Sequence, residues 1–213
     1  ADILPNVEFL APMVDDVELV LFETDEHGSN LPDESLRARL LSLAQEHDLT
    51  YTVHLPLDLR LGDDGGLDHV SLVKARRVID STRELDPYAY TMHLDGAPLL
   101  DGYTPGTLSD WLQRSHRVLS TVCGWLDHPQ KLCIENVEGW DPEVFAPLMD
   151  DLPVSRVVDV GHLWLQDVDP LEHLDRWLER TRVVHLHGIA ARDHSSLAGV
   201  KPSVLDPVVS SLA

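Results

Sequence analysis

The chain has 213 residues, enough for one sizeable hydrophobic core and too few for two of ordinary size. Its formal net charge is −21, with 16 basic against 37 acidic residues, which argues against a nucleic-acid partner because such partners are bound through lysine and arginine. No apolar run is long enough to cross a membrane and two cysteines cannot form a disulfide framework, so a cytoplasmic protein without a membrane partner is expected.

A unit of strand, polar turn and amphipathic helix recurs along the whole sequence. In chain order, strands are predicted over residues 17–24, 51–56, 90–95, 131–137, 156–160 and 182–188. Helices are predicted between them, over residues 32–47, 71–86, 107–126, 142–150 and 170–180. In the first helix, Leu36, Leu40 and Leu43 recur at helical spacing, and Pro32 suits a position in the first turn.

This alternation predicts a parallel sheet, because parallel neighbours need a helical crossover. No dinucleotide-binding glycine motif follows the first strand, which favours a parallel (β/α) barrel of the TIM type over a doubly wound sheet. We expect residues 1–213 to form a single β/α-barrel domain. Eight-stranded barrels usually need about 250 residues, so either the first and last strands lie outside this sequence or the barrel is incomplete.

Polar residues interrupt the apolar strands near the same end each time. A histidine or a carboxylate comes late in every predicted strand, at Glu23, His54, His93, Glu135, Asp159 and the pair His185 and His187. The C-terminal rim of a β/α barrel is where catalytic groups gather. Buried carboxylates are costly alone, and a shared cation satisfies several at once. The pattern therefore predicts a metal site at this rim.

Imidazole and carboxylate ligands without a thiolate indicate zinc, manganese or iron rather than calcium. The candidate ligands outnumber what one tetrahedral ion needs, which permits two or three ions and suits phosphoester hydrolysis. In Asp159-Val-Gly-His162, we expect Gly161 to turn the chain sharply so that both side chains reach one point. Asp193 and His194 are a further candidate pair, for which a solvated loop is the alternative interpretation.

Together these motifs resemble the superfamily of xylose-isomerase-like barrels, which includes endonuclease IV and sugar isomerases and epimerases. The resemblance spans essentially the whole chain. For an enzyme of the endonuclease IV type it implies metal ligands at His54, His93, Glu135, Asp159, His162, His185 and His194. Asp193 is offset by one residue from the spacing of that type. The glutamate that follows the eighth strand in that type has no counterpart, because this sequence stops before such a strand.

Within the superfamily, several segments are similar to the cobamide-remodelling phosphodiesterases of the CbiR family. They are LFETDEHGSNLP, YTVHLPLDLRLG, CIENVEG, VVDVGHLW and VVHLHGIAARDHSSL. The resemblance implies hydrolysis of the nucleotide loop of cobamides to cobinamide phosphate and α-ribazole. From the ligand types, we expect the cofactor to be a divalent metal, zinc or manganese, with more than one ion permitted. Glu135 would then bridge ions or act as a base, Glu23 would hold substrate or orient a ligand, and Arg192 would contact phosphate.

Three other functions stay open on the sequence. A sugar or sugar-phosphate isomerase or epimerase would use one manganese ion with Glu135, Asp159, His185 and Glu23. A DNA-repair endonuclease is disfavoured by the acidity of the chain. A binding module without enzymatic activity would be stable without metal. The number of bound ions distinguishes the first of these from the phosphodiesterase.

Overall fold

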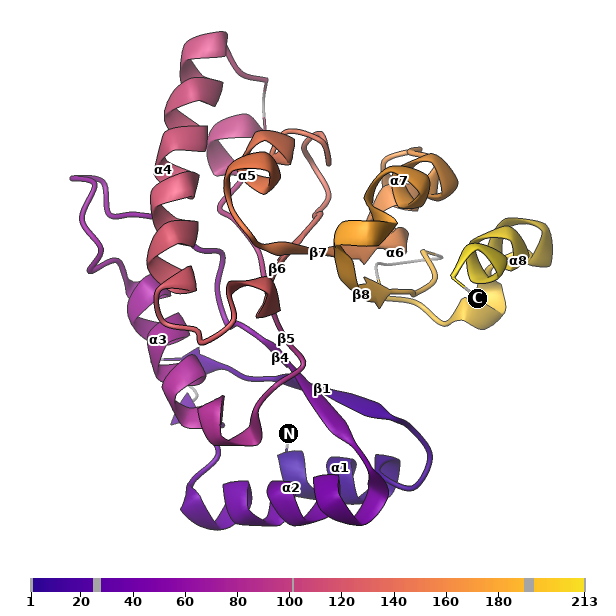
Figure 1. Ribbon diagram of the computed structural model, residues 1–213. Helices are drawn as coiled ribbons and strands as arrows, with labels where there is room; N and C mark the ends of the chain where they lie inside the picture. Colours follow the sequence, from indigo (N-terminus) through magenta and orange to yellow (C-terminus); the bar gives the residue numbers. More distant parts are fainter. Residues whose placement is uncertain (1, 25–27, 101, 190–193, 213) are drawn as a thin grey trace.

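The computed structural model describes residues 2–24, 28–100, 102–189 and 194–212. Its main sheet has six parallel strands, which lie side by side in chain order: β1 (Asp16–Val20), β4 (Thr50–His54), β5 (Ala89–Met92), β6 (Leu132–Glu135), β7 (Ser155–Asp159) and β8 (Thr181–His185). Figure 1 shows this sheet curling into an arc with helices around its outside. The predicted parallel β/α barrel architecture is confirmed as a curled half-barrel, in which β1 and β8 each pair with one described strand.

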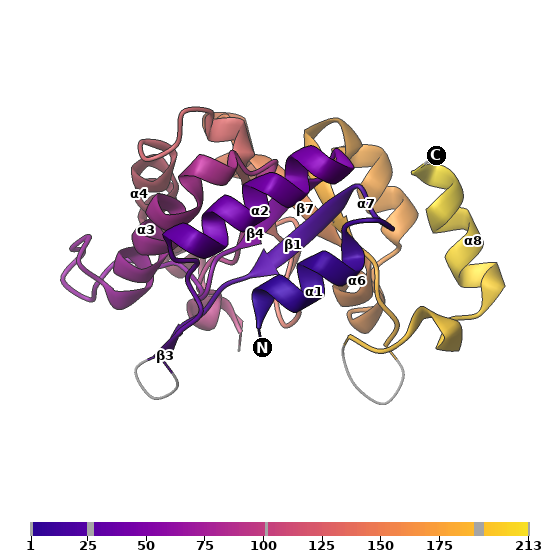
Figure 2. The same ribbon diagram turned by 90° about the horizontal axis from the view of Figure 1, so that it is seen from below.

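The helices follow the predicted alternation. They are α1 (Ile3–Leu10), α2 (Glu34–His47), α3 (Val70–Thr82), α4 (Pro105–Cys123), α5 (Ala146–Asp151), α6 (Val160–Leu165), α7 (Pro170–Trp177) and α8 (Pro202–Ser211). Figure 2 shows α1 and α2 beside β1 in the middle of the view, α3 and α4 at its left and α8 at its right edge. Asp33 caps α2 by accepting a hydrogen bond from the Leu36 amide, so Pro32 precedes the helix instead of occupying its first turn. None of the described helices has the length and apolar character needed to cross a bilayer.

The first predicted strand is shorter than the sequence indicates. β1 ends at Val20, and the chain then enters a small antiparallel hairpin of β2 (Glu23–Thr24) and β3 (Gly28–Ser29). The side chain of Asn30 explains this end. Its Oδ1 accepts a hydrogen bond from the Phe22 amide at 2.7 Å, and its Nδ2 donates to the carbonyl of Val20 at 3.1 Å. These bonds satisfy backbone groups that a longer strand would pair with its neighbour.

Small apolar side chains fill part of the space enclosed by the sheet. Ala89, Cys133 and Val157 are fully buried and pack together with Val183. Side chains alternate along a strand, so Glu135 follows Cys133, Asp159 follows Val157 and His185 follows Val183 on the same face. The inner face therefore changes from apolar to ionisable residues at the C-terminal ends of β6, β7 and β8.

Candidate metal centre

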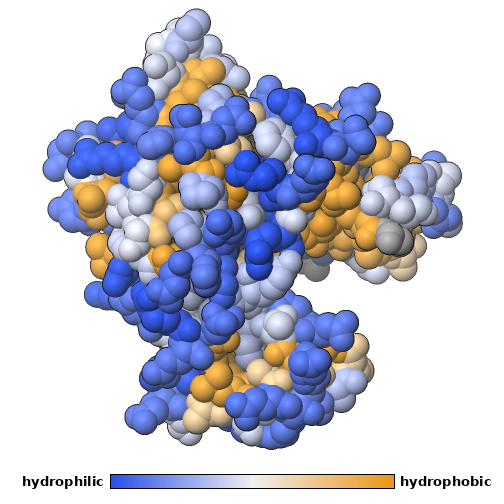
Figure 3. Space-filling model, viewed as in Figure 1, coloured by the Kyte–Doolittle hydropathy of each residue, from blue (hydrophilic) through white to orange (hydrophobic). Residues whose placement is uncertain are grey.

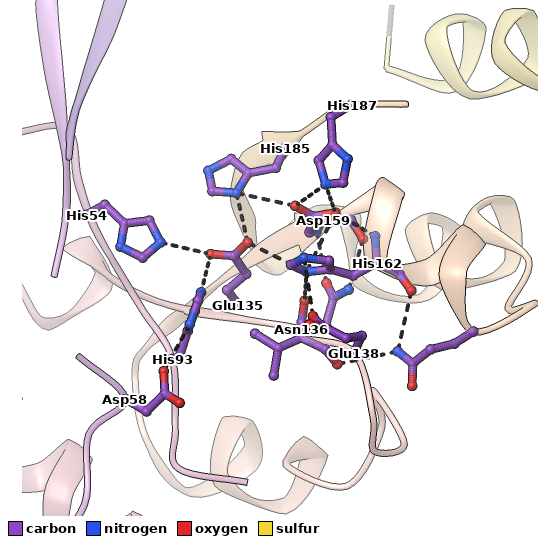
Figure 4. A network of polar contacts seen from close by, with 12 residues as sticks. His54, Asp58, His93, Glu135, Asn136, Glu138, Asp159, His162, His185 and His187 are labelled. Atoms are coloured by element: carbon purple, nitrogen blue, oxygen red, sulfur yellow. Dashed lines mark hydrogen bonds and ion pairs between the residues drawn. The ribbon is translucent and has the colours of Figure 1, made fainter. Parts of the chain in front are cut away.

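Glu135 is the centre of a cluster of histidines. It is the last residue of β6, and its side chain is only 2% exposed. One carboxylate oxygen, Oε2, lies 3.1 Å from Nε2 of His93 and 3.4 Å from Nε2 of His54. The other oxygen, Oε1, lies 2.9 Å from Nδ1 of His185. Figure 4 shows these three rings converging on the carboxylate from different parts of the sheet.

Asp159 is a second, fully buried carboxylate at the end of β7. Its Oδ1 accepts a hydrogen bond from the His162 amide at 2.7 Å and so caps α6. The same carboxylate lies 3.1 Å from Nε2 of His187 and 3.6 Å from Nδ1 of His185. Asp159 therefore both starts a helix and joins two histidines of the last strand and the loop after it.

Gly161 does not turn the chain as the sequence suggested, because it lies within α6. The reason for a glycine here is the ring of His187. A Cβ atom at position 161 would come within 2.0 Å of Cε1 of His187. The absence of a side chain at Gly161 therefore lets His187 lie directly over the first turn of α6 and reach Asp159.

Asn136 joins the ends of β6 and β7. Its side-chain amide donates to the Asp159 carbonyl and accepts from the Asp159 amide, both at 2.9 Å. Its own carbonyl lies 2.9 Å from Nδ1 of His162. All three contacts are buried, so Asn136 has a structural role in holding the ends of the two strands together.

Each of four histidines has one ring nitrogen held by an acceptor of the protein. Nδ1 of His54 contacts the Leu55 carbonyl at 2.8 Å, and Nδ1 of His93 contacts Asp58 at 3.1 Å. Nδ1 of His162 contacts the Asn136 carbonyl, and Nε2 of His185 contacts Glu18 on β1 at 3.0 Å. A neutral histidine that donates through one nitrogen presents a lone pair on the other, which is the arrangement of metal-binding histidines.

The electrostatics of the cluster follow from this packing. Burial disfavours the charged forms, but hydrogen bonds to Asp58 and Glu135 outweigh it and raise the pKa of His93 to about 9. Against the same burial, interactions with the carboxylates of Asp159, Glu135 and Glu18 raise the pKa of His185 to about 12. The histidines in turn hold the pKa of Glu135 well below its ordinary value, although burial alone would raise it. Protons on the rings therefore balance the buried carboxylates, as cations would.

The described residues contain three groups whose donor atoms lie within 4.8 Å of one another. They are His54, His93 and Glu135, then Glu135, Asp159 and His185, and finally His162, His187 and His194. Nitrogen and oxygen donors in this number fit zinc or manganese. Glu135 belongs to two groups, so neighbouring ions would share it. The predicted metal is thus compatible with the donor chemistry.

The structure brings together most of the side chains expected at the rim, namely His54, His93, Glu135, Asp159, His162, His185 and His194. Gly188 and Ser195 form two backbone hydrogen bonds with each other. The ring centroid of His194 lies 4.2 Å from the ring centroid of His187. Arg192 and Asp193 lie outside the described residues. Their expected roles, and the ligand roles of the other residues, stay predictions.

Glu23 is an expected site residue that the described structure does not bring into contact with the histidine cluster, and its role stays a prediction. It is in the β2–β3 hairpin and forms an ion pair with Arg77 of α3 at 3.2 Å. No contact within the described part of the chain joins it to the histidine cluster. Three other carboxylates, Glu18, Asp58 and Glu138, contact the candidate ligands His185, His93 and His162, and none of the three was predicted from the sequence. Glu18 did carry a signal, since it interrupts the apolar run of the first strand, whereas Asp58 is one acidic residue in a loop.

No protein-family model matches the sequence, and no curated protein matches it. Solved structures do match. A D-tagatose 3-epimerase-like protein aligns with a TM-score of 0.72 and 20% identity over 99% of this chain and 82% of its own. Endonuclease IV from Thermus thermophilus aligns with a TM-score of 0.59 and 19% identity over 97% of this chain and 84% of its own. The fold is that of the xylose-isomerase-like barrels.

A third protein with this fold also comes from Thermus thermophilus and was soaked with zinc chloride. It aligns with a TM-score of 0.60 and 21% identity over 86% of this chain and 71% of its own. At such identities the likeness establishes the xylose-isomerase-like fold alone. The chemistry of this protein depends on the side chains that its own chain places at the rim.

Proposed function

We propose that the protein is a divalent-metal-dependent phosphodiesterase. The observation that carries the proposal is the sharing of Glu135 between two groups of donor atoms, with a third group beside Asp159. Sites with more than one metal ion suit phosphoester hydrolysis, because ions on both sides of the phosphorus stabilise the attacking and the leaving oxygen. The presence of an endonuclease IV among the proteins of this fold agrees with this choice.

When bound, the ions would hold the phosphate, lower the pKa of a water molecule and stabilise the leaving oxygen. The chain itself supplies the geometry. Glu135 directs one oxygen toward His54 and His93 and the other toward His185, which suits a bridging ligand. Asp58 and Glu18 hold the far nitrogens of His93 and His185, so these rings are oriented before any ion arrives.

For the substrate we propose a cobamide, cleaved in its nucleotide loop to cobinamide phosphate and α-ribazole during corrinoid salvage and remodelling. The support is the similarity of the rim segments to the CbiR family, together with the acidity of the chain. A net charge of −21 repels the phosphate backbone of DNA. A compact substrate with a single phosphodiester avoids most of that repulsion.

A sugar or sugar-phosphate isomerase or epimerase is the second candidate function. The observation in its favour is that Glu135, Asp159 and His185 form a complete three-ligand group by themselves. The match to a D-tagatose 3-epimerase-like protein agrees with it. This alternative needs one ion, whereas the phosphodiesterase uses two or three, so the metal content per chain separates the two.

The test is release of α-ribazole from cobalamin by the zinc-loaded or manganese-loaded protein, followed by chromatography. We expect Glu135→Gln and His185→Ala to reduce turnover at least about a hundredfold, because each removes a donor from the cluster. Glu172→Gln and His47→Ala change exposed residues of α7 and α2 and serve as matched controls. No release by the wild-type protein with either metal would refute the cobamide assignment, and isomerisation of a ketose instead would support the second candidate.

A further inference from the structure

A groove of about 420 Å³ opens beside the candidate metal centre. One wall carries His93, His162 and His194, which belong to two of the three groups of donor atoms. A phosphate held at those histidines would therefore have one of its two ester arms next to this groove. Nothing in the proposed chemistry assigns a role to the rest of the lining, which includes Gly96, Leu100 and Trp140.

This part of the lining comes from two segments that pack closely against each other. Trp140 covers the backbone at Gly96, where a Cβ atom would lie 2.3 Å from the indole Nε1. Leu100 covers Gly139, where a Cβ atom would lie 2.8 Å from Cδ2 of the leucine. The indole of Trp140 is fixed from behind by Trp111, with ring centroids 5.5 Å apart. These contacts give the groove an apolar wall, on which Leu100 is 53% exposed.

The charged residues in the described lining of the groove are mainly acidic. Its described lining contains three carboxylates and neither a lysine nor an arginine. Asp95 is paired with Arg60, which lies outside the lining, at 3.2 Å. Asp58 and Glu138 are more than half exposed, and in the described structure their ion-pair partners are the histidines His93 and His162. Figure 4 shows both carboxylates at the edge of the histidine cluster.

We propose that this groove binds the second ester arm of the substrate, and that it selects an arm that is apolar and either uncharged or cationic. The exposed Leu100 and the Trp140 wall favour an apolar group, while Asp58 and Glu138 accept hydrogen bonds from amide or ammonium donors. The same carboxylates repel an arm with further phosphates, as in a nucleic acid. The inference rests on the proposed phosphodiesterase function and names the substrate class of the same site.

The experiment uses three p-nitrophenyl phosphodiesters whose second arm is a phenylbutyl chain ending in an ammonium, a carboxamide or a carboxylate. Binding to the zinc-loaded protein is measured by calorimetry, and p-nitrophenol release is measured separately. We expect the ammonium and carboxamide probes to bind at least about tenfold more tightly than the carboxylate probe, a difference of about 1.4 kcal/mol. Equal or inverted affinities, or no binding of any probe, would overturn the groove assignment.

Two variants, each with a matched control, test whether the preference among the probes arises from residues of the groove. Glu138→Lys should reverse the preference between the ammonium and carboxylate probes, whereas Glu172→Lys, an identical charge change on α7, should leave the ratio of their affinities unchanged. Leu100→Ala should weaken all three probes several-fold, and Leu171→Ala on α7 should not. Since the comparison is a ratio of affinities within each variant, a partial loss of metal cancels.

Probe affinity tests the groove assignment, and p-nitrophenol release tests the phosphodiesterase function, so either proposal can fail without the other. If the probes bind with the expected ranking but release no p-nitrophenol, the phosphodiesterase function fails while the groove assignment stands. If p-nitrophenol is released at equal rates from all three probes and their affinities are equal, the groove assignment fails and the hydrolytic function stands. A Glu138→Lys variant with the wild-type ranking would also refute the groove assignment.

Discussion

Glu18 extends from the first strand of the sheet to a histidine of the last one. It lies 3.0 Å from Nε2 of His185, and its pKa is lowered because His185, His54 and Thr91 together outweigh the effect of burial. It belongs to none of the three groups of donor atoms, so its role would be to orient His185. The position of this glutamate on β1 makes a candidate ligand on β8 depend on the opposite edge of the sheet.

We predict that Glu18→Gln lowers zinc affinity by about tenfold or more, because loss of the carboxylate loosens His185 and lowers its basicity. Affinity is measured by competition with a chromophoric chelator, and the visible spectrum of the cobalt-substituted protein reports the ligand geometry. Glu8→Gln, which changes an exposed residue of α1, is the control. Unchanged affinity and an unchanged cobalt spectrum would show that Glu18 does not orient His185.

Gly161 offers a second test at the scale of one residue. In Gly161→Ala the new Cβ collides with the ring of His187, so we predict displacement of that ring and a loss of stability of about 1–3 kcal/mol. Chemical denaturation measures the stability, and metal analysis measures the ions bound per chain. Gly106→Ala, also in a helix but with its nearest neighbour at 3.7 Å, should cost far less. Equal effects of the two substitutions would contradict the steric explanation.

Among single residues, the sequence predicted those whose type and position in a strand both pointed to the rim, such as His54, Glu135 and Asp159. It could not predict the contacts that hold these side chains. Asp58 contacts His93 from the loop after β4. The distance between the two side chains depends on how the loops after β4 and β5 fold. His187 was identified, but its contact with Gly161 depends on the packing of α6 against the chain after β8.

At the scale of elements, the strands were predicted well because each is a short apolar run between polar turns. The errors came where a side chain replaced a backbone partner. Asn30 ended β1 early, and the carboxylate of Asp159 began a six-residue helix that was too short to show a periodicity. α5 also begins later than predicted, at Ala146, because residues 141–145 form turns.

We predict that Asn30→Ala lowers the free energy of unfolding by about 1–3 kcal/mol, because the part-buried Phe22 amide loses its only side-chain acceptor among the described residues. Zinc content should not change, since no described contact links Asn30 to the cluster. Urea denaturation tests this. The exposed Asn6 donates to the carbonyl of Asp2, so Asn6→Ala should have a smaller effect. A larger effect in Asn6→Ala would refute this account of the end of β1.

At the scale of the whole molecule, the histidine cluster couples stability to pH. The pKa of His93 in the folded, metal-free protein is about 9, above its ordinary value of 6.5. Its protonation therefore stabilises the fold fully below pH 6.5, and this stabilisation is lost as the pH rises through 9. The lowered pKa of Glu135 acts in the opposite direction, because its contribution is lost as the pH falls below its ordinary value of 4.5.

We predict that the melting temperature of the chelator-treated protein falls between pH 6.5 and 9, and that saturating zinc removes or reverses this fall. Zinc competes with protons for the same ring nitrogens, so its binding should release protons that calorimetry in buffers of different ionisation enthalpy detects. The His93→Gln variant should show a shallower fall. An identical pH profile in wild type and His93→Gln would exclude His93 as the source.

The curled sheet leaves β1 and β8 at its two edges, and a notch separates the N-terminal and C-terminal parts of the surface in Figure 3. This arrangement has a consequence for the order of folding. Partners of Glu135 lie 42 and 50 residues away along the chain, so the cluster forms only after long loops have closed. The first group, His54, His93 and Glu135, comes from the region of β4 to β6. Each of the other two groups also needs residues from β8 or from the chain after it. During synthesis from the N-terminus, the ion at the first group is therefore expected to be captured before the others.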